Sequence, residues 1–181
     1  MSDYEYYDIN IKGYVEPAPI MALPSGIRIV FFNLHGNVRL TEHCGKELSK
    51  YLGDCEALLT VESKALQLTH VVARELGMAY YAVARKSKKL YMQDGLDVSI
   101  ESSITTGTEQ HLYLSRKDAD LLKGKKVGIV DDVISTGASL KGLEKLVENA
   151  DGIIYKKAAV LAEGAAKDRK DIIYLASIPI L

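Results

Sequence analysis

The chain has 181 residues, of which 48% are hydrophobic and 26% charged, and its net charge is -1 at pH 7. These values are typical of a globular protein with one domain and a substantial core, and they argue against nucleic acid as the main partner. No apolar run approaches about 18 residues and no basic-then-apolar leader is present, so we expect no membrane association.

The cysteines and histidines show no spacing typical of a metal site. Cys44 and Cys55 are the only two cysteines, and we interpret them as reduced thiols of a cytoplasmic protein. The sequence also lacks a Walker-type phosphate loop, a nucleophile elbow and a dinucleotide fingerprint. These absences exclude several common enzyme classes.

Residues 1–39 differ from the rest and are predicted to form an N-terminal cap. Tyrosines crowd residues 4–14, Pro and Gly punctuate residues 17–26, and an apolar run at 27–32 predicts a strand. A small cap over the main sheet and a peripheral strand with exposed tyrosines explain this segment equally well. Residues 40–181 form the predicted core domain.

The core domain begins with alternating helices and strands. Thr41 is the expected cap of a helix that ends at Gly53, and a buried strand is predicted at 55–61. A helix ending at Gly77 and a strand at 78–84 follow. Further apolar runs lie near 126–132, 155–161 and 172–178. This order predicts an α/β fold with a five-stranded parallel sheet flanked by helices.

A long connection at about 86–125 separates the two halves of this sheet. Apolar and polar residues alternate in residues 97–104 and again in 110–114, on either side of a Thr-Gly-Thr break. This pattern predicts a β-hairpin. Just before it, Arg85-Lys-Ser-Lys-Lys89 places four basic residues at the end of a strand. Such a cluster is suited to binding an anion, although a solvated loop would have the same composition.

Residues 127–139, Val-Gly-Ile-Val-Asp-Asp-Val-Ile-Ser-Thr-Gly-Ala-Ser, are the most informative stretch. A buried strand ends in the pair Asp131 and Asp132, and a turn of small residues leads into an amphipathic helix. A helix start binds phosphate through free N–H groups, and a carboxylate pair suits sugar hydroxyls or a hydrated metal ion. A strand followed by a capped helix, with no ligand, is the simpler alternative. A receiver domain, which also has an acidic pair after a strand, requires further βαβ units that this chain lacks.

This stretch resembles the signature of the type I phosphoribosyltransferases, which bind 5-phosphoribosyl 1-pyrophosphate. The resemblance implies that Asp131 and Asp132 hold the ribose 2- and 3-hydroxyls. It assigns the 5-phosphate to the turn formed by Ser135, Thr136, Gly137, Ala138 and Ser139. Two residues depart from the family pattern, because Ala138 and Ser139 stand where Gly and Thr are usual.

The same resemblance implies further roles. The pyrophosphate would be held by Ser63, Lys64, Arg85, Lys86 and Lys89, and Mg²⁺ would be bound by Asp131 and Asp132 through water. The connection 86–125 would be a hood loop that closes over the reaction centre. Glu101 would be an acidic loop residue like that of adenine-using members, and the active form would be a homodimer.

The sequence therefore predicts a purine phosphoribosyltransferase that uses phosphoribosyl pyrophosphate, with adenine as the favoured base. The segment 160–164 resembles xanthine phosphoribosyltransferases and the purine repressor's effector domain. The alternatives are thus an enzyme for xanthine or another 6-oxopurine, or a domain that senses phosphoribosyl pyrophosphate without turnover. Residues 1–39 contain no helix pair for DNA binding, which favours the enzyme; a pyrimidine enzyme ranks lower.

Overall fold

The computed structural model describes residues 5–100 and 110–181. Its main sheet has five strands in the order β10-β9-β8-β4-β5, and all neighbouring pairs are parallel. Because helices cover both faces of this sheet, its strands are the continuous apolar runs seen in the sequence. The predicted α/β fold is confirmed. The strands are β4 (Ala57–Val61), β5 (Ala82–Ala84), β8 (Lys126–Ile134), β9 (Ile153–Glu163) and β10 (Ile173–Ile178).

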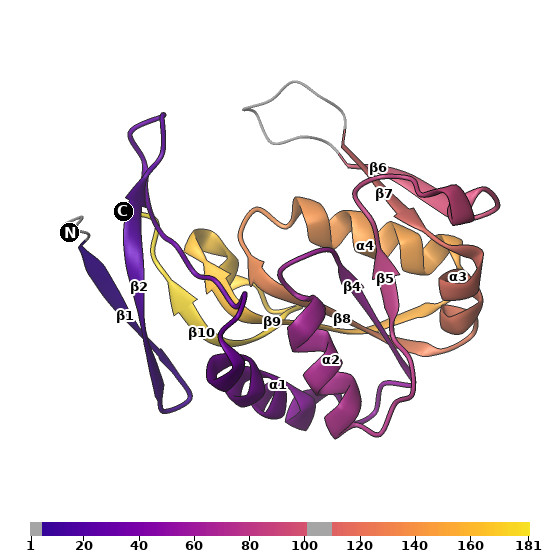
Figure 1. Ribbon diagram of the computed structural model, residues 1–181, viewed down its shortest axis with the longest axis horizontal. Coiled ribbons are helices and arrows are strands. Elements are labelled where there is room, and N and C mark those ends of the chain that lie inside the picture. The colour runs from indigo at the N-terminus through magenta and orange to yellow at the C-terminus, as the bar shows by residue number, and fades with distance from the viewer. Residues whose placement is uncertain (1–4, 101–109) are drawn as a thin grey trace.

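The four α-helices of the described residues cover the two faces in pairs (Figure 1). Helices α1 (Val38–Leu52) and α2 (Leu66–Glu75) pack on one face, and α3 (Arg116–Leu122) and α4 (Ala138–Asn149) pack on the other. Successive residues of a strand serve opposite faces. In β4, Leu58 joins the core on the α1 side, whereas Leu59 joins the core on the α4 side. None of the described helices is long and apolar enough to cross a membrane.

Helix α1 begins earlier than the sequence predicted. The side chain of Asn37 accepts a hydrogen bond from the Leu40 N–H at 3.1 Å and so caps the helix. Thr41, the expected cap, lies in the first turn, where its hydroxyl donates to the Asn37 carbonyl at 2.7 Å. The prediction of Thr41 as the cap is therefore wrong, because Asn37 supplies the acceptor that the free N–H groups need.

The N-terminal residues form a separate antiparallel sheet beside β10 (Figure 1). It contains β1 (Tyr6–Ile11), β2 (Tyr14–Ala22) and β3 (Arg28–Val30). Ile9 and Ile11 are buried in the core that includes α1, and Ile29 forms a bridge with Ile180 at the other end of the chain. This packing brings the residues after β3 to the edge of the main sheet where its strands end.

The predicted hairpin consists of β6 (Leu96–Ile100) and β7 (Gln110–Leu114), paired antiparallel. Its base packs on α4, since a Cβ on Gly142 would lie 2.9 Å from Ile100 Cγ1 and 3.0 Å from Leu112 Cδ1. Two backbone hydrogen bonds of 2.8 Å between Arg85 and Tyr113 tie β7 to the end of β5. Short 3-10 helices, η1 (Leu90–Met92) and η2 (Gly164–Asp168), complete the fold.

Candidate active site

The strand order places a crevice between β4 and β8. From β4 the chain moves outward to β5, whereas from β8 it moves in the opposite direction to β9 and β10. Helix α2, which follows β4, and helix α4, which follows β8, lie on opposite faces of the sheet. The connections after these two strands therefore diverge. Ligands of open α/β sheets bind at such a switch point, outside the carboxyl ends of the strands.

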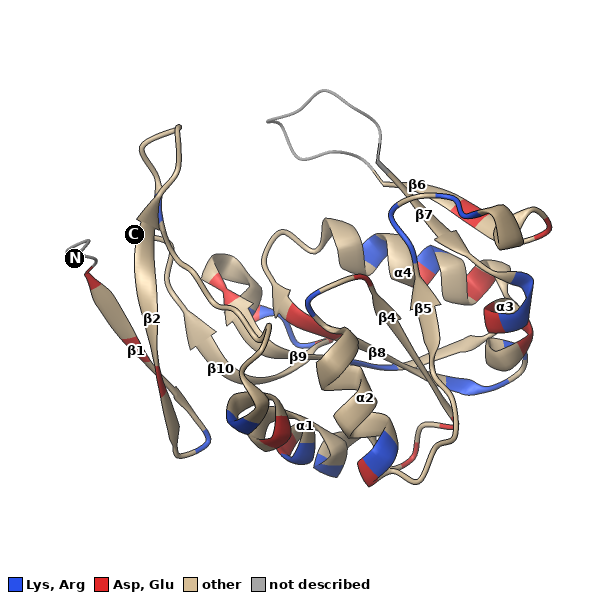
Figure 2. Ribbon diagram, viewed as in Figure 1, with Lys and Arg blue, Asp and Glu red and all other residues tan. Residues whose placement is uncertain are grey.

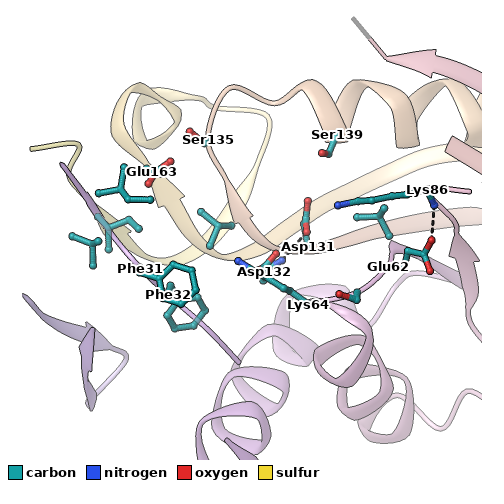
Figure 3. A pocket seen from close by; sticks show the side chains of 16 residues that line it. Phe31, Phe32, Glu62, Lys64, Lys86, Asp131, Asp132, Ser135, Ser139 and Glu163 are labelled. Atoms are coloured by element: carbon teal, nitrogen blue, oxygen red, sulfur yellow. Dashed lines mark hydrogen bonds between the residues drawn. The ribbon is translucent and has the colours of Figure 1, made fainter. Parts of the chain in front are cut away.

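A cavity of about 400 Å³ opens at this edge (Figure 3). It combines residues at or just after the ends of all five strands of the main sheet with residues of β3 and the segment that follows it. Its lining is Ile29, Val30, Phe31, Phe32, Val61, Glu62, Ser63, Lys64, Lys86, Asp131, Asp132, Val133, Ser135, Ser139, Glu163 and Ile178.

Asp131 and Asp132 lie at the centre of this cavity, near the end of β8. They are only 7% and 9% exposed, and the Asp132 N–H donates to Asp131 Oδ1 at 2.9 Å. Burial raises the pKa of Asp131 well above its usual range, and the negative charge of Asp132 raises it further. Lys86 acts in the opposite direction but does not outweigh them. The pair is thus short of positive charge and of donors, which a sugar diol or a cation would supply.

The turn between β8 and α4 offers hydrogen-bond donors to an anion. Gly137 precedes α4 with a left-handed backbone at φ +81°, a conformation that Gly adopts without steric cost. The N–H groups at the start of this 12-residue helix and the hydroxyls of Ser135 and Ser139 face the same region, and both serines line the cavity. This arrangement suits a phosphate group beside the carboxylate pair.

A second turn, after β4, supplies Ser63 and Lys64 to the cavity. The peptide bond between Glu62 and Ser63 is cis. Glu62 links this turn to the end of β5, because its Oε1 accepts the Lys86 N–H at 2.6 Å and its Oε2 lies 2.6 Å from Arg85 Nε. Figure 2 shows residues of both charges in the turn after β4, beside the acidic end of β8, and basic residues at the end of β5.

The structure brings most of the predicted site residues together. Ser63, Lys64, Lys86, Asp131, Asp132, Ser135 and Ser139 all line the cavity, whereas Thr136, Gly137 and Ala138 belong to its turn without lining it. Arg85 is paired with Glu62, and Lys89 donates to Ser87 Oγ at 2.8 Å, so neither lines the cavity. Glu101 lies outside the described residues.

The apolar end of the cavity was missed by sequence reasoning. Phe31 and Phe32 lie there with Val133 and Ile178, and Glu163 is the single charged residue among them (Figure 3). Lys64 Nζ lies 5.1 Å from the centre of the Phe31 ring, so the polar and aromatic parts meet. One signal was available, because the only two phenylalanines of the chain are adjacent. An aromatic face beside a diol-binding and anion-binding region suits a flat heterocycle.

Comparisons with known proteins agree with this geometry. The family model described as the phosphoribosyl transferase domain matches residues 38–178. A xanthine phosphoribosyltransferase of Bacillus cereus is 31% identical over 156 residues, which cover 82% of this chain and 77% of the relative.

Solved structures share the fold. The adenine phosphoribosyltransferase of Thermoanaerobacter pseudethanolicus is 25% identical with a TM-score of 0.65, over 78% of this chain and 82% of that one. The enzyme of Trypanosoma brucei, solved with AMP, pyrophosphate and ribose-5-phosphate, has a TM-score of 0.65 at 15% identity, over 97% and 76%. The resemblance inferred from residues 127–139 is confirmed, and the chain belongs to the phosphoribosyl transferase family.

Proposed function

We propose that this chain is a purine phosphoribosyltransferase. It would transfer the 5-phosphoribosyl group from phosphoribosyl pyrophosphate to a purine base and release pyrophosphate. The observation that supports this most strongly is one cavity that holds the Asp131–Asp132 pair beside the turn at the start of α4. A ribose 5-phosphate unit presents a diol, which suits the carboxylate pair, and a phosphate, which suits the turn.

In the proposed reaction, the bond between ribose C1 and a pyrophosphate oxygen breaks, and its electron pair leaves with pyrophosphate. A ring nitrogen of the base forms the new bond to C1 and loses its proton to solvent. Asp131 and Asp132 orient the ribose through its hydroxyls. Ser63, Lys64 and Lys86, with Arg85 and Lys89 beside them, stabilise the leaving pyrophosphate. The contribution of the chain is thus alignment, charge stabilisation and exclusion of water.

Mg²⁺ is the proposed cofactor, and the residues present fit it. Two adjacent buried carboxylates repel each other, and a divalent cation relieves that repulsion. In the part of the chain that the structure describes, no group of three or more His, Cys, Asp or Glu side chains could hold a metal ion. Asp131 and Asp132 would therefore add one or two contacts, directly or through water, to those from substrate oxygens. The bound ion would neutralise charge on the departing pyrophosphate.

The base would lie at the apolar end, against Phe31 and Phe32. Because both phenylalanines belong to the proposed cap, residues 1–39, the cap would bind the base while the core domain, residues 40–181, binds the phosphoribosyl group. Adenine is the favoured base, and the Glu163 carboxylate could accept a hydrogen bond from its amino group. Xanthine or another 6-oxopurine is the alternative, since the Bacillus relative is named for xanthine. Glu101 keeps its proposed role as an acidic loop residue of adenine-using members.

A cytoplasmic homodimer is proposed as the working form. Cys44 and Cys55 are free and buried, which suits a reducing compartment. The basic segment at the end of β5, with Lys88 exposed, is available to a neighbouring subunit's pyrophosphate.

The experiment that tests the function is a panel of bases. The protein is mixed with phosphoribosyl pyrophosphate, Mg²⁺ and adenine, xanthine, guanine or hypoxanthine separately, and pyrophosphate release is followed. We expect turnover with adenine. Turnover with xanthine alone selects the alternative base, and saturable binding without turnover for any base supports a sensor domain. Absence of phosphoribosyl pyrophosphate binding would contradict the proposal altogether.

A further inference from the structure

The turn formed by residues 135–139 contains no charged side chain. A phosphate monoester carries a charge of about -1.5 to -2 at pH 7. The cavity lining contains four carboxylates, those of Glu62, Asp131, Asp132 and Glu163, but only two cations, Lys64 and Lys86. Both lysines follow β4 or β5, on the pyrophosphate side of the carboxylate pair. The turn would therefore bind phosphate more tightly with a cation of its own.

Arg169 provides that cation. A Cβ built on Gly137 would lie 2.6 Å from Arg169 Nη1 and 3.9 Å from its Cζ. The difference between these distances is close to the length of a C–N bond with partial double-bond character, about 1.33 Å. The Cζ–Nη1 bond therefore points almost directly at Gly137. Any side chain at position 137 would displace the guanidinium, so the glycine allows the two to approach.

The orientation of Arg169 is fixed by Asp171. Arg169 Nε donates to Asp171 Oδ1 at 3.0 Å and Nη2 donates to Oδ2 at 2.7 Å, a bidentate pair that directs Nη1 away from Asp171. Lys157 also donates to Asp171 and, at 2.7 Å, to Glu144 of helix α4. The guanidinium is thus connected through side chains to the helix whose first turn faces the cavity.

We propose that Arg169, oriented by Asp171, is a positioning residue of the 5-phosphate site. It does not line the cavity but lies against Gly137, and it acts on the phosphate through this turn. Its guanidinium stays protonated at every working pH and supplies positive charge close to the bound phosphate. It also holds the turn in the conformation that presents its N–H groups. The inference rests on the proposed function of this cavity.

The test measures the binding of two fragments, ribose 5-phosphate and pyrophosphate, to the full chain in the presence of Mg²⁺. Calorimetry gives the affinity for each fragment. Arg169→Gln should lower the affinity for ribose 5-phosphate by about tenfold and leave the affinity for pyrophosphate within about twofold of the wild-type value. Arg169→Lys should restore part of the affinity, because it keeps the charge but loses the bidentate contact. Asp171→Asn should give a smaller loss than Arg169→Gln. In turnover, KM for phosphoribosyl pyrophosphate should rise while kcat changes little.

Arg74→Gln is the matched control, because Arg74 makes a bidentate pair with Glu42, at 2.9 and 2.7 Å, away from the cavity. Thermal unfolding of every variant separates a binding effect from a loss of fold. If Arg169→Gln binds ribose 5-phosphate as the wild type does, or if both fragments lose affinity equally, the inference fails. If the wild type binds neither fragment, the proposed function fails instead.

Discussion

The carboxylate of Asp131 is buried beside that of Asp132, and both conditions raise its pKa. A raised pKa means that the stabilising contribution of this group is present at low pH and is lost as pH rises through the folded-state value. Ionisation of Asp131 therefore destabilises the free protein. Such a site lowers the stability of the free protein but favours ligand binding, because the ligand supplies the positive charge and hydrogen-bond donors that the pair lacks.

Asp131→Asn should therefore make the protein more stable and inactive. Removing the charge relieves the repulsion, and for a chain of this length Tm rises by roughly 2–4 °C per kcal/mol gained. The transfer rate should fall by about a hundredfold or more, because the ribose diol loses an ionised acceptor. Calorimetric unfolding and pyrophosphate release measure the two effects. Asp120→Asn, an exposed change on α3, is the control. A lower Tm or a normal rate for Asp131→Asn would contradict the role assigned to the pair.

At the scale of elements, Glu62 couples the ends of β4 and β5. It accepts the Lys86 N–H and pairs with Arg85, and its side chain is 20% exposed. Glu62→Ala should release Lys86 and weaken pyrophosphate binding about fivefold, which corresponds to about 1 kcal/mol. Glu62→Gln should have a milder effect, since its amide oxygen still accepts the N–H. Titration of pyrophosphate checks both, with Glu42→Ala as the control on α1. Equal affinities for wild type and Glu62→Ala would refute this coupling.

The elements also explain what the sequence could and could not reveal. Strands β8 and β9 were predicted because they are buried on both faces and are therefore continuous apolar runs. The strand expected at 78–84 pairs only over Ala82–Ala84, because β5 is an edge strand whose register with β4 starts at Leu59. Local patterns identified the residues after β4 and β8, since strand, turn and helix are contiguous there.

The apolar end of the cavity depends on contacts between distant parts of the chain. Phe31 and Phe32 meet Glu163 and Ile178 only because the N-terminal sheet packs beside β10. Arg169 reaches Gly137 for a similar reason, across 32 residues of sequence. The adjacent phenylalanines mark an aromatic segment, but no local pattern says what either segment contacts, since both contacts are set by tertiary packing. The sequence therefore identified the regions proposed for the diol and the phosphate but not the region proposed for the base.

At the scale of the whole molecule, ligand binding and protonation should be linked. Asp131 and Asp171 respond to pH in opposite ways. Hydrogen bonds from Arg169 and Lys157 lower the pKa of Asp171, so its contribution to stability is lost as pH falls through the lowered value. Asp171 is 48% exposed, so solvent screens this effect. Asp131 is buried and its pKa is raised, so it should dominate proton exchange on binding.

Ribose 5-phosphate with Mg²⁺ should bind to the ionised form of Asp131 and release protons wherever the free protein still holds one. Binding heats measured in two buffers of different ionisation enthalpy should therefore differ, and the difference should grow as pH falls into the range where the free protein holds the Asp131 proton. The Tm of the complex, relative to that of the free protein, should rise over the same range as pH increases. Asp131→Asn removes this titrating group, so the buffer dependence of its heats should fall to the part that comes from ionisation of the ligand's own phosphate. If the wild type and Asp131→Asn show the same buffer dependence, Asp131 is already ionised before the ligand binds and the predicted linkage is wrong.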